Sequence, residues 1–212
     1  DLFWSFRSPY SYLAVRSIQD MRQKYDLTVT VRPVYPIAVR TPKFFSDVNP
    51  LWIPYLLNDI ERVGAMKNIP ISWPRPDPVK VNRATGEIPK EQPYIHRLTH
   101  LGIAASEVGD GLDFVDCISN LLWNGEVRGW HEGDHLANAA AQKDFDLAAL
   151  DAMIEDHFDD YAAKVEVNQQ ALEASGHWGV PTLAYKNEAF FGQDRVDVCL
   201  WRMLEDGLQE RK

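Results

Sequence analysis

The sequence predicts an α/β fold in which two short α/β units enclose a long helical middle. A strand, a helix and a second strand are expected in the first 34 residues. A helix, a two-stranded hairpin and a last helix are expected near the end of the chain. Between them, roughly residues 37–150 combine proline-rich breaks with helical stretches at 92–101 and 113–123, and contain no internal repeat.

The composition is that of a globular protein. The chain has 212 residues, 45% of them hydrophobic, and 22 Lys and Arg against 31 Asp and Glu give a net charge of −9. This acidic balance disfavours a protein that tracks nucleic acid phosphates or anionic membranes. The most apolar uncharged run, residues 51–57, is far short of the ~20 residues that span a bilayer. Only Cys117 and Cys199 could form a disulfide, so we expect both to be buried thiols in a reducing, cytoplasmic compartment.

The first element is an aromatic-rich run at residues 2–6, which is typical of a buried strand. Ser8 then precedes Pro9, the order of an N-cap hydroxyl followed by proline at the first helical position. Apolar residues at intervals of three and four predict a helix that ends near Asp26. Residues 27–32 alternate apolar and polar, which predicts a half-buried strand that stops at Pro33.

The C-terminal elements follow from similar patterns. Helical stripes run from Leu147 to Phe158 and over residues 161–174, and Gly176 follows as a typical C-terminal glycine. Two short apolar runs around the turn at 186–188 predict a hairpin. We expect the last helix to open at Gly192, with Asp194 in its first turn.

A β-α-β unit and an α-β-β-α unit are the two halves of a thioredoxin fold. We therefore assign residues 1–36 and 160–212 to a thioredoxin-like domain and residues 37–159 to a helical insertion domain.

The reactive group of a thioredoxin fold sits where the first strand meets the first helix, because the helix N-terminus offers unpaired N–H groups and a positive dipole. A Cys-x-x-Cys there performs disulfide exchange. This chain has Ser8-Pro9-Tyr10-Ser11 instead, which excludes disulfide exchange by its own residues at this turn. The simpler alternative is that Ser8 only caps the helix.

A second motif, Gly179-Val180-Pro181-Thr182, comes directly before a predicted strand. At this point of a thioredoxin-like fold the proline is usually cis, and the preceding N–H and C=O can pair with an extended peptide. An ordinary strand-initiating proline is the alternative.

Together these motifs make the sequence resemble the family of 2-hydroxychromene-2-carboxylate isomerases and kappa-class glutathione transferases. The resemblance covers nearly the whole chain, and its most specific parts are the Ser-Pro-Tyr-Ser motif and a Gly-Gln-Asp-Arg motif at 192–195. Supporting matches lie at residues 55–62 and 69–71.

The resemblance implies glutathione as cofactor. Ser8 would hydrogen-bond its sulfur, and the backbone of Val180 beside Pro181 would pair with its cysteinyl unit. Gln193 and Asp194 would hold its γ-glutamyl end. By a weaker match, Asn49 would contact the opposite end of the tripeptide.

The expected activity is that of a cytoplasmic, homodimeric isomerase in which a glutathione thiolate held by Ser8 adds reversibly to an unsaturated aromatic carboxylate. The alternatives are a kappa-like glutathione transferase and a noncatalytic thioredoxin-like binding module. Ser5 and Arg7 depart from the residues usual in the family, which leaves the substrate side open. Candidates for a carboxylate pocket there are Arg7, Trp73, Arg75 and Arg83.

One motif suggests a different chemistry. His131-Glu132-Gly133-Asp134-His135 matches the H-E-x-x-H pattern of zinc peptidases. Glycines at 129 and 133 disfavour a helix across it, and Asp134 suits an N-cap, so a turn leading into a helix is the simpler interpretation. His96 and His100 are expected at a surface or an interface rather than as metal ligands. We predict no metal site.

Overall fold

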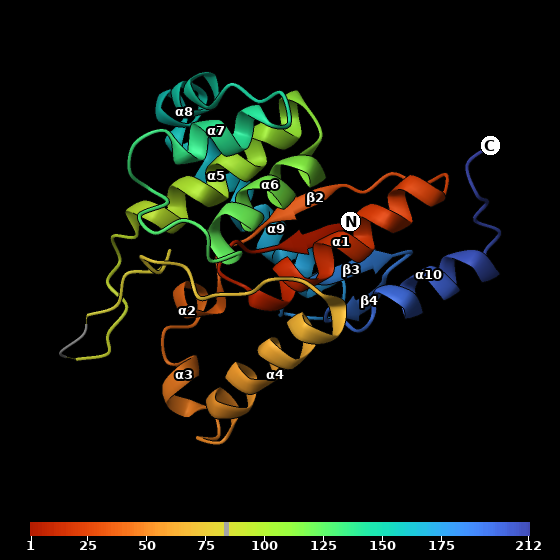
Figure 1. Ribbon diagram of the computed structural model, residues 1–212, viewed down its shortest axis with the longest axis horizontal. Coiled ribbons are helices and arrows are strands. Elements are labelled where there is room, and N and C mark those ends of the chain that lie inside the picture. The colour runs from red at the N-terminus through yellow and green to blue at the C-terminus, as the bar shows by residue number, and fades with distance from the viewer. Residues whose placement is uncertain (83–84) are drawn as a thin grey trace.

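A four-stranded mixed sheet forms the centre of the computed structural model, which describes residues 1–82 and 85–212 (Figure 1). The strand order is β2-β1-β3-β4, and β1 pairs parallel with β2 and antiparallel with β3, which pairs antiparallel with β4. The strands are β1 (Leu2–Trp4), β2 (Val31–Pro33), β3 (Thr182–Tyr185) and β4 (Glu188–Phe191). This is the predicted thioredoxin-like fold.

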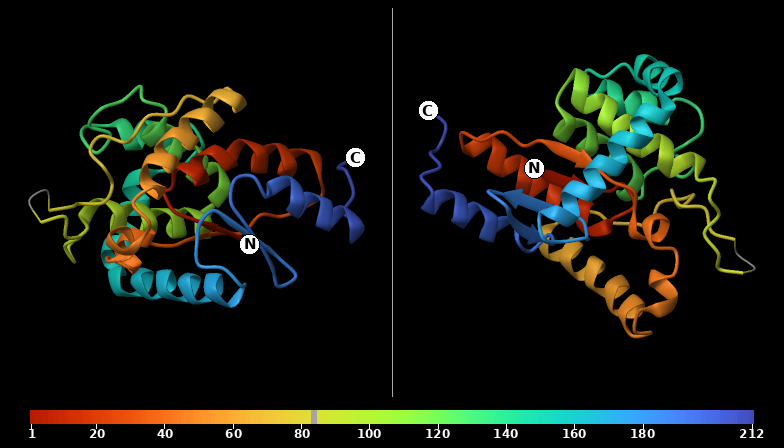
Figure 2. Two further views of the ribbon diagram at one scale, coloured as in Figure 1. Left: turned by 90° about the horizontal axis from the view of Figure 1, so that it is seen from below. Right: turned by 180° about the vertical axis from the view of Figure 1, so that it is seen from behind.

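Helices cover both faces of the sheet. Leu2 and Trp4 point into the main core with α1 (Pro9–Lys24), whereas Phe3 points to the other face and packs with Leu172 of α9 (Phe158–Ala174). This follows from the alternation of side chains along a strand. The last helix, α10 (Val196–Glu205), contacts α1, β3 and β4. Figure 2 shows β1 and β3 between α9 on one side and α1 on the other.

The middle of the chain is helical, as predicted. It contains, in order, α2 (Ile37–Arg40), α3 (Phe44–Asp47), α4 (Trp52–Lys67), α5 (Pro93–Val108), α6 (Gly111–Trp123), α7 (His135–Ala141) and α8 (Leu147–Asp156). The division into two domains stays a prediction, and its boundary at residues 159 and 160 falls in the first turn of α9. No described helix is both long enough and apolar enough to cross a membrane.

The helix α5 approaches the sheet closely through Gly102. A Cβ atom at this position would lie 3.0 Å from Cγ of Pro33 and 3.1 Å from Cε2 of Phe6. Since such contacts are tighter than ordinary van der Waals packing allows, the glycine lets α5 lie against the ends of β1 and β2. This contact holds the helical middle of the chain against the carboxyl ends of β1 and β2, next to the turn that leads from β1 into α1.

Several predicted boundaries were wrong, among them the end of the first strand, which lies at Trp4 rather than at residue 6. The second strand covers only Val31–Pro33, although alternation begins at Leu27, because its pairing with β1 begins where Leu2 lies opposite Val31. The last helix begins at Val196 rather than Gly192. Gly192 adopts a φ of +109°, which is not helical, so Asp194 lies in the turn before the helix and Asp197 is the acid in its first turn.

Candidate functional site

Ser8 occupies the turn between β1 and α1 as predicted. It is the N-cap of α1, and its Oγ accepts a hydrogen bond of 3.2 Å from the backbone N–H of Ser11. The backbone N–H of Ser8 donates to the carbonyl of Ser5 at 3.0 Å, which closes the turn. No described hydrogen bond uses the N–H of Tyr10, so the positive end of the helix presents one open donor beside the Ser8 hydroxyl.

The loop that ends at Pro181 lies against Ser8. The Val180–Pro181 peptide bond is cis, as predicted, and the Ser8 hydroxyl donates to the Val180 carbonyl oxygen at 3.2 Å. None of the described hydrogen bonds involves the N–H of Val180. The loop therefore offers an unused backbone donor next to the Ser8 side chain, as an extended peptide ligand would require.

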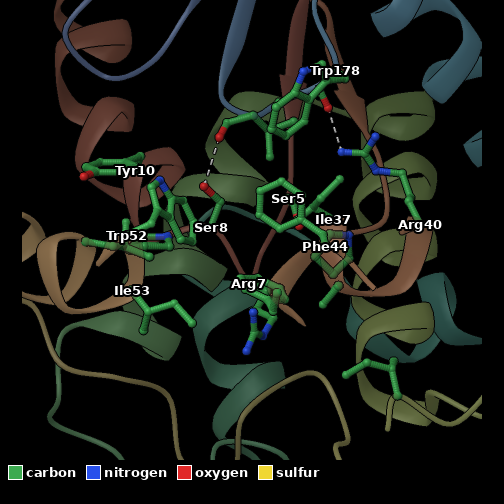
Figure 3. Close-up of a pocket in the computed structure, with 18 of the residues that line it drawn as sticks. Ser5, Arg7, Ser8, Tyr10, Ile37, Arg40, Phe44, Trp52, Ile53 and Trp178 are labelled. Carbon is green, nitrogen blue, oxygen red and sulfur yellow. Dashed lines mark hydrogen bonds between the residues drawn. The ribbon is translucent and has the colours of Figure 1, made fainter. Parts of the chain in front are cut away.

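A cavity of about 520 Å³ has Ser8 and Val180 in its wall, and Figure 3 shows Ser8 among the side chains that surround it. Ser5, which is 1% exposed, also lines it, and the Ser5 hydroxyl has no described hydrogen-bond partner. The walls are largely aromatic and aliphatic, as in most small-molecule sites. Prominent apolar lining residues are Ile37, Phe44, Phe45, Trp52, Leu56, Trp73, Trp178 and Phe191.

Tyr10 joins the first helix to the insertion. Its hydroxyl donates to Oδ2 of Asp59 on α4 at 2.6 Å, which links two of the motifs that carry the sequence resemblance. Burial, together with this carboxylate, raises the pKa of Tyr10 well above its usual range. The phenol is thus a neutral hydrogen-bond donor that fixes α4 over the cavity, and its ring forms part of the wall.

Arg7 lines the cavity, but a carboxylate already holds its charge. Its Nε and Nη2 donate to the two oxygens of Asp77, each at 2.8 Å. Asp77 also accepts from Trp73 Nε1 at 3.2 Å and from the N–H of Val79 at 2.8 Å. This bidentate pair leaves Arg7 poorly suited to the predicted role of binding a carboxylate.

The other predicted members of a carboxylate pocket have different surroundings. Trp73 lines the cavity, with its N–H engaged by Asp77. Arg75 is exposed and lies outside the cavity wall. Arg83 lies outside the described residues.

Arg40, at the end of α2, was not predicted and is the second arginine of the cavity wall. Its Nε donates to the carbonyl of Tyr35 at 2.7 Å and its Nη2 to the carbonyl of Trp178 at 2.8 Å. It could have been found from topology. β1 and β2 are parallel, so their carboxyl ends meet at one edge of the sheet, and Ser8 and Arg40 follow these two ends.

The residues predicted to hold the ends of glutathione do not line this cavity. Gly192 donates its N–H to the carbonyl of Pro181 at 2.9 Å, which places Gln193 and Asp194 next to the cis-proline loop. Oε1 of Gln193 is buried without a described partner, and Asp194 pairs with Arg195 at 2.7 Å. Asn49 is exposed, and its side-chain oxygen accepts from the N–H of Leu51 at 3.0 Å, a local turn before α4.

Both cysteines are buried, as predicted, and neither lines the cavity. The Cys117 thiol donates to the carbonyl of Phe114 at 3.3 Å within α6. Burial raises the pKa of Cys117 to about 12 and that of Cys199 to about 11. Burial and a raised pKa are typical of structural rather than reactive thiols.

The zinc-like motif does not form the required geometry. The helix α7 begins at His135, with Asp134 as its N-cap residue, so His131 precedes the helix and the two histidines do not share one of its faces. The described residues contain no cluster of three His, Cys, Asp or Glu that could hold a metal. His100 is fully buried against Tyr35 rather than at a surface, so that prediction was wrong: apolar packing of α5 buries the whole inner face of the helix.

Comparisons with known proteins agree with the thioredoxin-like fold. A family model described as DSBA-like thioredoxin domain matches residues 1–203. The chain is similar in structure to a 2-hydroxychromene-2-carboxylate isomerase, with a TM-score of 0.67, 19% identity and coverage of 97% of this chain and 94% of that one. It is also similar to the cytosolic disulfide reductase DsbM from Pseudomonas aeruginosa, with a TM-score of 0.56, 15% identity and coverage of 96% and 97%. No curated protein sequence matches significantly.

Proposed function

The chain belongs to the DSBA-like thioredoxin family, and on that premise we propose that it is a glutathione-dependent isomerase of the 2-hydroxychromene-2-carboxylate isomerase type. One observation carries the proposal. The position that begins the Cys-x-x-Cys of a disulfide oxidoreductase is Ser8, whose hydroxyl lies between the N-terminus of α1 and the cis-proline loop. A site of this form, without a cysteine, suits a thiol that is brought in by a cofactor.

The groups around Ser8 fit glutathione. The N–H of Val180 has no described partner and would pair with the cysteinyl backbone. The buried Oε1 of Gln193, also without a described partner, is an acceptor for the γ-glutamyl ammonium, and Asp194 would add a counter-charge. The hydroxyl of Ser8 and the N–H of Tyr10 would face the sulfur.

Ser8 and the helix N-terminus stabilise a thiolate in this proposal. A thiol with a pKa near 8.5 is about 3% ionised at pH 7, and lowering that pKa by ~2 units raises the thiolate to about 75%, roughly 25-fold. The Ser8 hydroxyl proton would turn from the Val180 carbonyl to the sulfur, while its oxygen continues to accept from Ser11. When bound, glutathione supplies a thiolate that adds reversibly to an unsaturated carbon, so that a double bond becomes rotatable before the thiol leaves again.

The cavity wall supports an aromatic or unsaturated carboxylate as substrate. Phe44, Trp52 and Trp178 offer flat apolar surfaces around the cavity that Ser8 lines, and such surfaces favour planar ligands. Disulfide reduction, the activity named for the DsbM neighbour, is a poor fit for this chain because both of its cysteines are buried and outside the cavity.

Calorimetric titration with glutathione tests the proposal. The parent protein should bind at millimolar or lower concentration, and the absorbance of the thiolate near 240 nm should show a lowered thiol pKa in the complex. Ser8→Ala should lose most of that pKa shift. Ser11→Ala is the matched control, because the buried Ser11 hydroxyl makes no described hydrogen bond. Absence of binding to the parent, or normal thiolate formation with Ser8→Ala, contradicts the proposal.

A second measurement separates an isomerase from a kappa-like glutathione transferase. Candidate unsaturated aromatic carboxylates are incubated with catalytic amounts of protein, and product and free thiol are followed together. Isomerisation at constant thiol concentration is the expected result. Loss of one thiol per product would assign the site to a transferase instead.

A further inference from the structure

The charge of the cavity differs from that of the whole protein. The chain carries a net charge of −9, yet no described acid lines the cavity, and its charged lining residues are Arg7 and Arg40. Since the rest of the wall is largely apolar, an unbalanced positive charge here acts in a medium of lower dielectric than water and attracts anions more strongly than a surface cation does.

Only one of these two arginines has its charge balanced. Asp77 holds Arg7 with two hydrogen bonds of 2.8 Å and does not itself line the cavity. Arg7 and Asp77 together contribute no net charge to the cavity. Arg7 also lies over the rings of Phe45 and Trp73, at 5.8 and 5.5 Å from their centroids, which fixes it as part of the wall.

Arg40 has no such partner. Its described hydrogen bonds go to the neutral carbonyls of Tyr35 and Trp178, and no described carboxylate forms an ion pair with it. Burial lowers the pKa of Arg40, and the more distant charge of Glu173 partly opposes that effect. The guanidinium stays charged at every physiological pH, because its ordinary pKa is above 12. A partly buried guanidinium with only neutral partners is suited to bind an anion.

We propose that Arg40 binds the carboxylate of the second reactant, while Ile37, Phe44 and Trp178 contact its apolar body. This inference rests on the proposed function, because it requires the thiol to occupy the Ser8 side of the same cavity. The buried Ser5 hydroxyl, which has no described partner, offers one further hydrogen bond to a polar group of the reactant. The site therefore selects aromatic acids over their neutral analogues.

The spacing of the two anchors suits one small molecule. Arg40 and Ser8 donate to the carbonyls of Trp178 and Val180, which are two residues apart in the same loop. A two-residue segment spans no more than about 7 Å. A ligand whose carboxylate is at Arg40 can thus place a conjugated carbon near the sulfur position at Ser8.

Binding of a matched pair of probes tests the inference without knowledge of the substrate. 1-Naphthoate and 1-naphthamide have the same ring system and differ in charge, and each is titrated into the protein saturated with glutathione. We expect the parent to prefer the acid by at least 10-fold. Arg40→Gln should abolish the preference and leave affinity for the amide within 3-fold, while Arg40→Lys, which keeps the charge, should retain part of it.

Arg62→Gln is the control for net charge, because it removes an exposed arginine of α4 that does not line the cavity. It should keep the full preference. A preference that persists in Arg40→Gln overturns the inference. If Arg40→Gln instead weakens glutathione 10-fold and leaves the naphthoate preference intact, Arg40 binds a carboxylate of glutathione, and the inference is also wrong. Failure of the parent to bind glutathione at all would reject the proposed function itself, separately from these outcomes.

Discussion

Ser8 and Val180 are 172 positions apart in the chain, and the hydroxyl of Ser8 donates a hydrogen bond of 3.2 Å to the carbonyl of Val180. The same hydroxyl oxygen accepts from the N–H of Ser11 and caps α1. A serine hydroxyl has one proton and two lone pairs, so the cap does not use the proton. Ser8 can therefore direct its proton to a ligand without opening the helix. The cap and the proposed role at the sulfur are compatible.

The capping role has its own consequence for stability. Ser8→Ala should lower the free energy of unfolding by about 1 kcal/mol, because the N–H of Ser11 loses its acceptor. Ser8→Thr keeps the hydroxyl and should lose less than half as much. Urea unfolding followed by circular dichroism measures both values. Equal stability of the parent and Ser8→Ala would show that the cap contributes nothing.

The elements on either side of Ser8 could be predicted because their signals are local. Ser8 before Pro9 marks the start of α1, and the turn at Lys186 and Asn187 marks the hairpin. Both turn residues have positive φ, at +47° and +66°, which is typical of a two-residue hairpin turn. Local signals also located the cis-proline loop.

The cavity wall could not be predicted in the same way, because its residues meet only through tertiary packing. From the sequence, Arg7 is a candidate anion-binding residue. The structure shows that Asp77, 70 positions away, already pairs with its guanidinium. Arg40 gives the opposite case. It lies in a four-residue helix that carries no recognisable motif. Its proposed role in binding an anion depends on the absence of an acidic side chain from the described cavity wall, which the sequence does not reveal.

The two cysteines should be inert in the native protein. Their raised pKa values, about 12 for Cys117 and about 11 for Cys199, keep almost no thiolate at pH 8. Reaction with Ellman's reagent should therefore be at least about 100-fold slower than in 6 M guanidinium chloride, where both should react. The Cys117→Ser and Cys199→Ser double variant should keep full glutathione binding. Fast native labelling of either thiol would contradict this and would reopen disulfide chemistry by the chain itself.

The pair between Arg7 and Asp77 should stabilise the loop over the cavity. Asp77→Asn retains the shape of the side chain but loses the charge. The NH2 group that replaces one carboxylate oxygen can no longer accept a hydrogen bond from Arg7. Since the two side chains are only 16% and 27% exposed, we expect a loss of about 1–2 kcal/mol in the free energy of unfolding. Asp47→Asn is the control, because Asp47 is exposed and the one described hydrogen bond of its carboxylate comes from the Ser46 hydroxyl. Equal losses in the two variants would show that the ion pair adds nothing.

His100 should make the fold sensitive to acid. It is fully buried, its Nε2 lies 2.8 Å from the Tyr35 hydroxyl, and the other neighbouring rings are His96, Phe158 and Tyr161. Burial, with a smaller effect from the charge of His96, lowers the pKa of His100 from 6.5 to about 4. The unfolded chain therefore takes up a proton at His100 before the folded protein does, as pH falls below 6.5. The folded state loses stability between pH 6.5 and about 4, and no loss from this group occurs above pH 6.5.

The size of this effect can be isolated with His100→Gln, whose side chain still offers Tyr35 a hydrogen-bond partner but does not titrate. At pH 5 the expected loss from His100 is about 2 kcal/mol, since each unit of pKa difference corresponds to ~1.4 kcal/mol. The difference in unfolding free energy between the parent and His100→Gln should therefore shift by about 2 kcal/mol in favour of the variant from pH 7 to pH 5. Carboxylates that titrate in the same range affect both proteins equally and cancel in the difference. A difference that stays constant with pH would mean that His100 takes up its proton equally well in the folded and unfolded states.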